Sequence, residues 1–498
     1  METGHVKDAR LGTFLAYTRT VDVPITFLLN YTNPVLNSVS DAFAISEAHA
    51  ESGALLEGPL PGSNSFIDDG LMADLFSDIF PEVHIEAGAS ARDEASKVIS
   101  LPPDRSLHRR TNELVSLLEL QYWATPSAFP LRVDHFPADL ARAVFSSENI
   151  TANASAFFIS FHPHTPFIHR SSFDLPTAPL HLLLALSLSG SIFAAPTDEA
   201  LSARCFFSLG EEHIFGLLRK IISRKDVCSD NHVAIVQAAV LMHALQVDSN
   251  HEGVRHRIRV HRFPEVVAAV RALGLFNMTR SSTWDTSSWE DYVHDEVRIR
   301  LAARVCLTDC MSTLFFKTPP QITLAEMRGS LPSTDAVFEA QSSTEFATLV
   351  ASYDSTKLQR RGLKSLVELF LQDNWDGPSR PSLANLATEN LIALIFAFHS
   401  MIFTCRTGLV LESTISVLLR ATARWKDIWY VVQARENARG KIPIGFAKYG
   451  LELWWLAAKI LEVAKNSDMQ SAYMSGAVTD SLSELHDFIQ HHIVPAHL

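Results

Sequence analysis

Apolar and polar positions along most of this chain follow a helical period. After Asn112, Leu114, Leu117, Leu118 and Tyr122 recur three and four positions apart, a spacing that places an apolar stripe along one side of a helix. Similar stretches predict further helices at 134–145, 179–195, 197–222, 232–245, 266–275, 337–353, 364–372, 385–407, 413–434, 446–463 and 480–492. Since no alternation of β-branched residues is long enough for a sheet, the pattern predicts an all-α fold.

The longest predicted helix starts near Trp289. Ser287 and Glu290 have the spacing of a capping box at its start, and Pro319 and Pro320 end it because proline cannot continue a helix. Apolar residues recur every four positions at Trp289, Val293, Val297, Leu301 and Val305. We therefore expect these five side chains to face the core.

Charged residues lie between these apolar positions. Glu296 and Arg300 are four apart, and Asp295 and Arg298 are three apart, which are the spacings of ion pairs on a helix surface. A second capping box at 323–326 predicts a short turn of helix after the proline break.

Residues 156–173 predict an irregular, buried segment rich in aromatic side chains, here called the aromatic plug. Pro163 and Pro166 forbid a regular helix, yet the stretch carries Phe157, Phe158, Phe161, Phe167, Ile168 and Phe173. His162, His164 and His169 also lie here, but not at the spacing of a zinc-binding helix. We interpret them as structural histidines beside proline turns.

The first 105 residues differ from the rest. Gly, Ser and Pro are frequent, and no Lys or Arg occurs from Thr20 to Ala91, so we predict a disordered acidic tract. Residues 66–80 interleave acids with large apolar residues, and a partner could induce a helix there with Leu71, Leu75, Phe76, Ile79 and Phe80 on one face. Two interpretations stay open: an activation segment that folds on a coactivator, or a linker or short helix packed on the domain.

Composition restricts the candidate chemistry. The formal net charge is −13 and the five cysteines are scattered, which disfavours nonspecific DNA binding and a disulfide framework. Arg255, Arg257, Arg259 and Arg262 form the strongest basic run, which we interpret as a solvated helix face paired with acids. Familiar catalytic and nucleotide-binding motifs are missing from the sequence, so we predict no catalytic, cofactor or metal residues. Two apolar stretches, 180–195 and 391–405, are shorter than a membrane span, and no signal peptide is recognised.

The order of these segments resembles the fungal-specific transcription factor domain. The plug is similar to the opening motif of that family at Phe161, His162, Pro163, Pro166, Phe167, His169 and Phe173. The later motif is matched by Trp289, Glu296, Arg298 and Arg300, followed by Pro319 and Pro320 and a closing Leu331-Pro332. Relatives usually bind zinc through an upstream DNA-binding module with paired cysteines, whereas the first cysteine here is Cys205.

The resemblance implies a large multi-helical regulatory domain at 106–345, preceded by the acidic tract 1–105 and followed by a helical extension at 346–498 packed on the same domain. It further implies a nuclear transcription regulator, acting on a metabolic gene set through transcription machinery or a DNA-binding partner. DNA would then be contacted only indirectly, or through a module outside this chain. Self-association stays open. The alternative is a helical small-molecule sensor or enzyme with a pocket between helices.

Overall fold

The computed structural model describes residues 23–33, 46, 105–130, 135–224, 228–247, 249, 251–280, 289–352, 361–375, 377, 383, 386–466, 471–475 and 478–493. Within these ranges the backbone forms α-helices joined by short 3-10 and π-helical segments, and no strand. The predicted all-α class is therefore confirmed. The candidate activation segment 66–80 lies outside the described residues.

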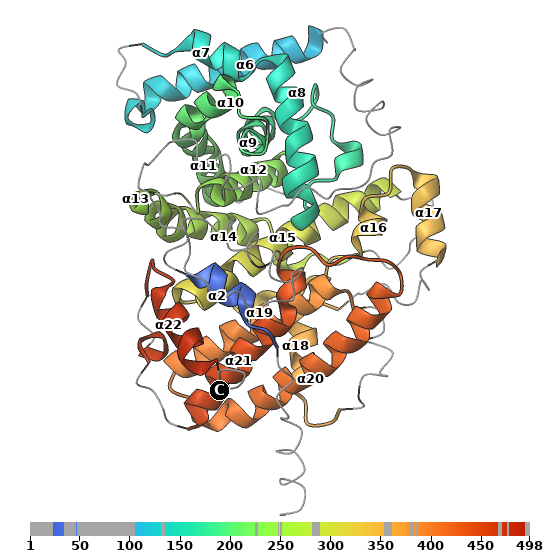
Figure 1. The fold of residues 1–498 in the computed structure, drawn as a ribbon. Helices are drawn as coiled ribbons and strands as arrows, with labels where there is room; N and C mark the ends of the chain where they lie inside the picture. Colours follow the sequence, from blue (N-terminus) through green and yellow to red (C-terminus); the bar gives the residue numbers. More distant parts are fainter. Residues whose placement is uncertain are drawn as a thin grey trace, which may run out of the picture.

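The helices form one stack along the long direction of the molecule (Figure 1). Helices α6 to α12 gather at one end and α18 to α22 at the other, and α15 crosses between them, in contact with α19, α12 and α14. The helix bounds are α2 Thr26–Thr32, α6 Arg105–Ala124, α7 Ala138–Val144, α8 Ser147–Ala156, α9 Leu180–Gly190, α10 Asp198–Ser202, α11 Phe207–Arg224, α12 Asp230–Gln246, α13 Glu252–His256, α14 Phe263–Ala272, α15 Trp289–Phe316, α16 Asp335–Phe338, α17 Ser343–Ser352, α18 Leu363–Leu371, α19 Thr388–Thr407, α20 Leu411–Asn437, α21 Gly450–Lys465 and α22 Ser483–His492.

The aromatic plug is irregular, as predicted, and buries four of its six large apolar side chains, whereas Phe161 and Phe173 are half-buried. Phe157–Phe161 is π-helical, and His162–His164 and Arg170–Ser172 are 3-10 turns. Phe157 and Phe167 are almost completely buried. The backbone of the plug is irregular because Pro163 and Pro166 supply no N–H for a regular helix. Most of its rings are nevertheless buried.

The predicted stripe on α15 is correct only in its second half. Leu301 and Val305 are buried, but Trp289, Val293 and Val297 are only half-buried. Over the first turns the buried positions are instead Tyr292, Glu296, Arg298, Ile299 and Arg300. A period-four apolar pattern identified the wrong side here, because the buried side carries charges that compensate one another. Ser287, the predicted cap, lies outside the described residues.

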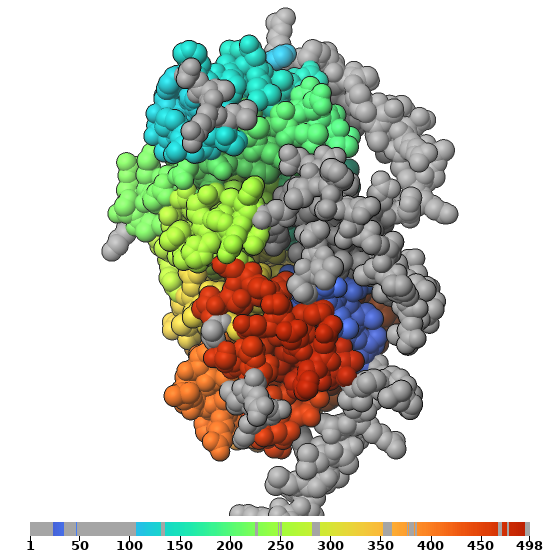
Figure 2. Space-filling model, turned by 60° about the vertical axis from the view of Figure 1, so that its left-hand side comes forward, coloured from blue at the N-terminus to red at the C-terminus, as the bar shows by residue number. Residues whose placement is uncertain are grey.

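Part of the tract predicted to be disordered is folded. Helix α2 (Thr26–Thr32) buries Phe27 and Leu28 completely, and Phe27 stacks on Tyr449 with ring centroids 4.0 Å apart. The carboxyl group of Glu452 accepts hydrogen bonds from the N–H groups of Phe27 and Leu28, 3.2 and 2.8 Å away. It thereby satisfies donors that are free at a helix start. Figure 2 shows α2 in blue beside the C-terminal helices in red.

Helix α19 (Thr388–Thr407) is a core helix by its packing. Its length and composition alone would allow it to cross a membrane, but 72% of its apolar window is buried inside the fold. It lies against α15, α20 and α21. Trp425 and Trp429 on α20 are buried, whereas Trp454 and Trp455 on α21 are half-buried.

Candidate functional site

Among the described residues, a cluster of buried charged side chains surrounds Glu296, in the first half of α15. Its side chain is fully buried and lies 2.7 Å from Arg280 Nε and 2.9 Å from Arg300 Nε. It also accepts hydrogen bonds from the Ser333 amide at 2.7 Å and the Ser333 hydroxyl at 2.9 Å. The predicted Glu296–Arg300 ion pair is therefore confirmed, and Arg280 adds a second cation to it.

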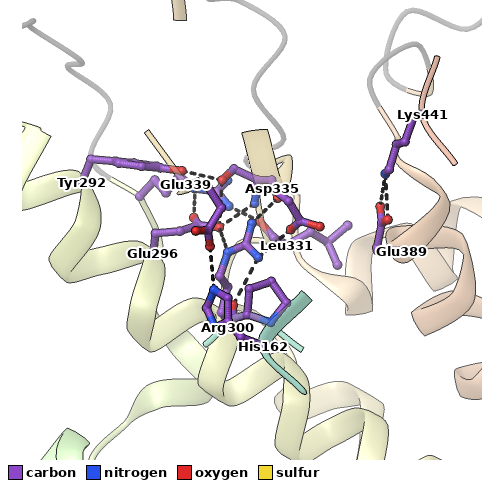
Figure 3. A network of polar contacts seen from close by, with 12 residues as sticks. His162, Tyr292, Glu296, Arg300, Leu331, Asp335, Glu339, Glu389 and Lys441 are labelled. Atoms are coloured by element: carbon purple, nitrogen blue, oxygen red, sulfur yellow. Dashed lines mark hydrogen bonds and ion pairs between the residues drawn. The ribbon is translucent and has the colours of Figure 1, made fainter. Parts of the chain in front are cut away.

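Arg300 connects the aromatic plug to the segment that follows the proline break (Figure 3). One terminal nitrogen donates to the Pro166 carbonyl at 3.2 Å and to Asp335 at 2.7 Å. The other donates to the Ser333 carbonyl at 2.7 Å, and the guanidinium lies over the Phe338 ring at 4.2 Å. Sequence segments that are far apart thus meet at one side chain.

Arg280 is one of the cluster members that the sequence did not reveal. The backbone at 276–280 runs beside 329–331, with the Gly329 amide 2.7 Å from the Phe276 carbonyl and the Ser330 amide 2.8 Å from the Met278 carbonyl. A Cβ on Gly329 would come within 2.6 Å of the Met278 carbonyl oxygen, so only glycine permits this approach. The pairing directs Arg280 toward Glu296, where it also donates to the Leu331 carbonyl.

The electrostatics of the cluster favour fixed charges. Burial by itself would raise the pKa of Glu296, but Arg280, Arg300 and the hydrogen bonds from Ser333 outweigh it and the pKa is lowered. Burial also raises the pKa of Tyr292, whose hydroxyl lies 2.6 Å from the Ser333 hydroxyl. Neither Glu296 nor Tyr292 is thus tuned to exchange a proton near neutral pH. The arrangement holds segments together.

The plug histidines go to separate partners. His162 Nε2 lies 2.8 Å from Glu339, and His169 Nδ1 lies 2.8 Å from the Ser172 hydroxyl. The edge of the His169 ring faces Phe338 at 5.2 Å. Among the described residues no three His, Cys, Asp or Glu side chains gather as a metal site would require.

The other motif residues lie away from Glu296. Phe161 stacks on Phe157 at 5.4 Å, Phe173 packs against Phe158, and the Phe167 carbonyl accepts a hydrogen bond from the Gln237 side chain at 2.8 Å. Trp289 is half-buried, with its ring 5.7 Å from that of His169. These rings therefore fill space around the charged cluster.

Arg298 points to a different neighbour from the one predicted. It donates to Asp230 at 2.6 Å and to the His294 carbonyl at 2.8 Å. The predicted Asp295–Arg298 pair is therefore wrong, because burial turns Arg298 toward the start of α12. This contact fastens α15 to α12.

Asp309 on α15 holds the segment that directly follows Pro319 and Pro320. Asp309 accepts the backbone N–H groups of Gln321 and Ile322, at 3.0 and 2.8 Å for its Oδ2. Burial raises the pKa of Asp309 to about 6, although these N–H groups act in the opposite direction. Pro319 is exposed and Pro320 half-buried, so their role is to turn the chain. The second capping box, Thr323 and Glu326, is confirmed.

The basic run is paired with acids, but it is not solvated as predicted. Arg257 and Arg262 both contact the buried carboxylate of Glu211, at 2.7 and 2.6 Å. Arg259 and Arg262 are themselves buried, and Arg259 pairs with Asp480. A π-helical turn at 257–262 changes the register of the helix. The sequence pattern, which assumed a regular α-helix, therefore misplaced these side chains.

A cavity of about 360 Å³ lies beside α15. Its wall is mostly apolar and comes from the plug, α15, α19, the segment 444–447 and Tyr31 of α2. His164 and His243 also line it, and burial lowers the pKa of each to about 3. Both imidazoles are therefore neutral at physiological pH. The structure therefore has a pocket between helices next to the charged cluster, a feature that the alternative interpretation requires.

Comparison with known proteins shows which family part of this chain resembles. Residues 154–373 match the family model of the fungal specific transcription factor domain. The match includes the plug, α15 and the segment through Ser333, so the resemblance seen in the sequence is confirmed over this range.

Two relatives are similar over longer stretches. The transcription factor verF of Penicillium polonicum is 25% identical over 398 residues, which cover 73% of this chain and 54% of the relative. The zinc finger protein zas1 of Schizosaccharomyces pombe is 23% identical over 337 residues, which cover 63% of this chain and 35% of the relative. The chain thus matches about half and about a third of the length of these proteins. No solved structure matches the chain.

Proposed function

We propose that this chain is a regulator of transcription whose helical domain serves as its regulatory part. The observation that carries the proposal is the charged cluster at Glu296 and Arg300, which joins three segments of the domain. The plug, α15 and the segment after the proline break are joined there by Arg300, Pro166 and Ser333, within the range that matches the family model. The match to a transcription factor of Penicillium polonicum supports the same conclusion.

The finer parts of the proposal concern location and partners. The regulator acts in the nucleus, on a set of metabolic genes, and reaches DNA through a partner or through a module outside this chain. The segment 66–80 recruits transcription machinery through Leu71, Leu75, Phe76, Ile79 and Phe80. The proposal includes no catalytic role for the charged cluster, which is built from compensated ions rather than from a proton donor and acceptor.

A reporter assay tests the role in transcription. The full chain is fused to an unrelated DNA-binding module, and expression from a promoter with matching sites is compared with that from the module alone. The proposal expects a change in reporter output in either direction. A fusion that is nuclear and stable, yet leaves the reporter unchanged, contradicts it.

A matched variant tests the segment itself. Phe76→Ala combined with Phe80→Ala in the same fusion removes both aromatic anchors and keeps the acids. Activation should fall severalfold, because ordering a short segment costs about 2–5 kcal/mol and leaves little spare binding energy. Equal activation by the double variant would show that 66–80 is only a linker.

A further inference from the structure

Helix α6 (Arg105–Ala124) lies at the outer end of the helical stack (Figure 1). Its inner side packs on α7, α8, α9 and α11, and Leu114, Leu118 and Tyr122 are buried there. Its outer side carries Leu120 and Trp123, which are 74% and 56% exposed. Tryptophan is enriched where proteins bind one another, so an exposed tryptophan next to an exposed leucine is typical of an interaction surface.

A groove of about 700 Å³ lies beside this outer side. The residues of α6 that line it extend from Arg109 to Gln121, so the groove follows the helix for about 18 Å. Leu180 of α9 and His213 of α11 form its other wall. A helix ridge next to a groove of the same length is self-complementary in shape, because the ridge of a second copy can enter the groove.

The charges on the outer side of α6 are balanced in the same way. Arg109, near the start of the helix, is 82% exposed, and Glu119, near its end, is exposed as well. Arg109 pairs with Glu113 on its own helix at 2.9 Å, but an exposed pair of this kind is weak and leaves the guanidinium accessible. An acidic segment such as 66–80 suits this side less well, because Glu113 and Glu119 would repel it.

We propose that two copies of the chain associate through α6, with the two helices antiparallel about a two-fold axis. An axis near residue 114 places Arg109 of each copy opposite Glu119 of the other and Asn112 opposite Ser116, since each pair is spaced equally about that position. Leu120 and Trp123 of each copy then cover the first turns of the partner helix. The inference goes beyond the proposed role in transcription and does not depend on it, because self-association is a property of the purified chain.

Sedimentation equilibrium of the full chain tests the association. We expect dimers with a Kd in the micromolar range, because one helix and its groove make a small interface. Leu120→Ser combined with Trp123→Ser should raise this Kd by about tenfold or more, since a few large side chains dominate such contacts. Ile442→Ser is the matched control, because Ile442 is 77% exposed on the segment after α20 and its loss should leave the Kd unchanged.

Two outcomes would overturn the proposal. The first is a wild-type chain that stays monomeric at high micromolar concentration, which would leave the outer side of α6 to another segment of the chain or to a different protein. The second is a double variant that associates as tightly as wild type, which would place the interface elsewhere.

Exchanging charges tests the antiparallel arrangement. Arg109→Glu and Glu119→Arg, each alone, place like charges opposite one another and should weaken self-association severalfold. An equimolar mixture of the two variants restores opposite charges at both contacts, so mixed dimers should form about as tightly as wild-type dimers. Both positions are exposed, so unfolding temperatures should match wild type and exclude misfolding as the cause. Mixed dimers no tighter than those of either variant alone would overturn the antiparallel pairing.

Discussion

Removing the carboxylate of Glu296 should destabilise the domain more than any exposed charge change. Glu296→Ala deletes the acceptor of two arginines and of the Ser333 amide and hydroxyl, all within 2.7–2.9 Å. Arg300 keeps Asp335 and two carbonyls as partners, whereas the Ser333 amide loses its carboxylate acceptor. The side chains of Arg280 and Arg300 stay buried.

The magnitude follows from this geometry. Breaking a buried ion pair from one side costs about 3–5 kcal/mol, and two buried cations are affected here, so we expect the upper end of this range for Glu296→Ala. Glu296→Gln keeps the shape and one carbonyl acceptor, but its amide N–H groups then face an arginine donor. We therefore expect the lower end, about 3 kcal/mol, for Glu296→Gln.

Urea unfolding followed by circular dichroism measures these free energies, provided that the slopes of the transitions agree between variants. Asp139→Asn is the control, because Asp139 pairs with Arg142 on an exposed surface and should leave the midpoint unchanged. A midpoint for Glu296→Ala that matches the control would refute the reasoning, and would mean that the cluster is solvated in solution.

Three further predictions concern other parts of the chain. Burial raises the pKa of Glu452 to about 8, so the folded protein retains a proton that the unfolded chain releases. The stability contributed by Glu452 should therefore be complete below about pH 4.5 and fall by a few kcal/mol as the pH rises through 8. Urea midpoints of wild type and Glu452→Gln, measured at pH 5 and pH 8, would reveal the difference. Trp425→Ala should cost about 3–5 kcal/mol, since its ring is buried against Trp429 and its N–H donates to the Leu391 carbonyl, and the half-buried Trp289→Ala should cost less than half as much; similar thermal shifts for the two would contradict the burial described here. Elemental analysis of the purified chain should find no tightly held zinc, and one zinc ion per chain would refute this prediction.

Local signals predicted the end of α15 and the ion pair between Glu296 and Arg300. Pro319 and Pro320 stop the helix by their own chemistry, and Glu296 and Arg300 are neighbours because they are four positions apart. Arg280 could not be found in the same way. Its place depends on the close approach of 276–280 to Gly329, a contact between segments about 50 residues apart in the chain. The spacing of apolar and polar residues within one helix does not predict a contact with a distant segment.

Compensated burial explains the other errors. Glu296, Arg259 and Arg262 are all buried, although charged residues are normally expected at the surface. Each is buried next to an oppositely charged partner from another element. Because charged residues were assumed to face solvent, the buried side of each helix was predicted wrongly. Helix α2 was missed for a related reason: its acid-rich surroundings suggested disorder, and the carboxyl group that caps it is 425 positions away.

Helix α2 gives the folded unit a discontinuous sequence. Phe27 lies in the core and Tyr31 on the cavity wall, while the next described helix, α6, begins at Arg105. A single proteolytic cut between 34 and 104 would therefore leave two polypeptides that stay together through α2. Gel filtration of a nicked chain would recover both fragments in one peak, and a fragment that begins after residue 34 would lack part of its own core.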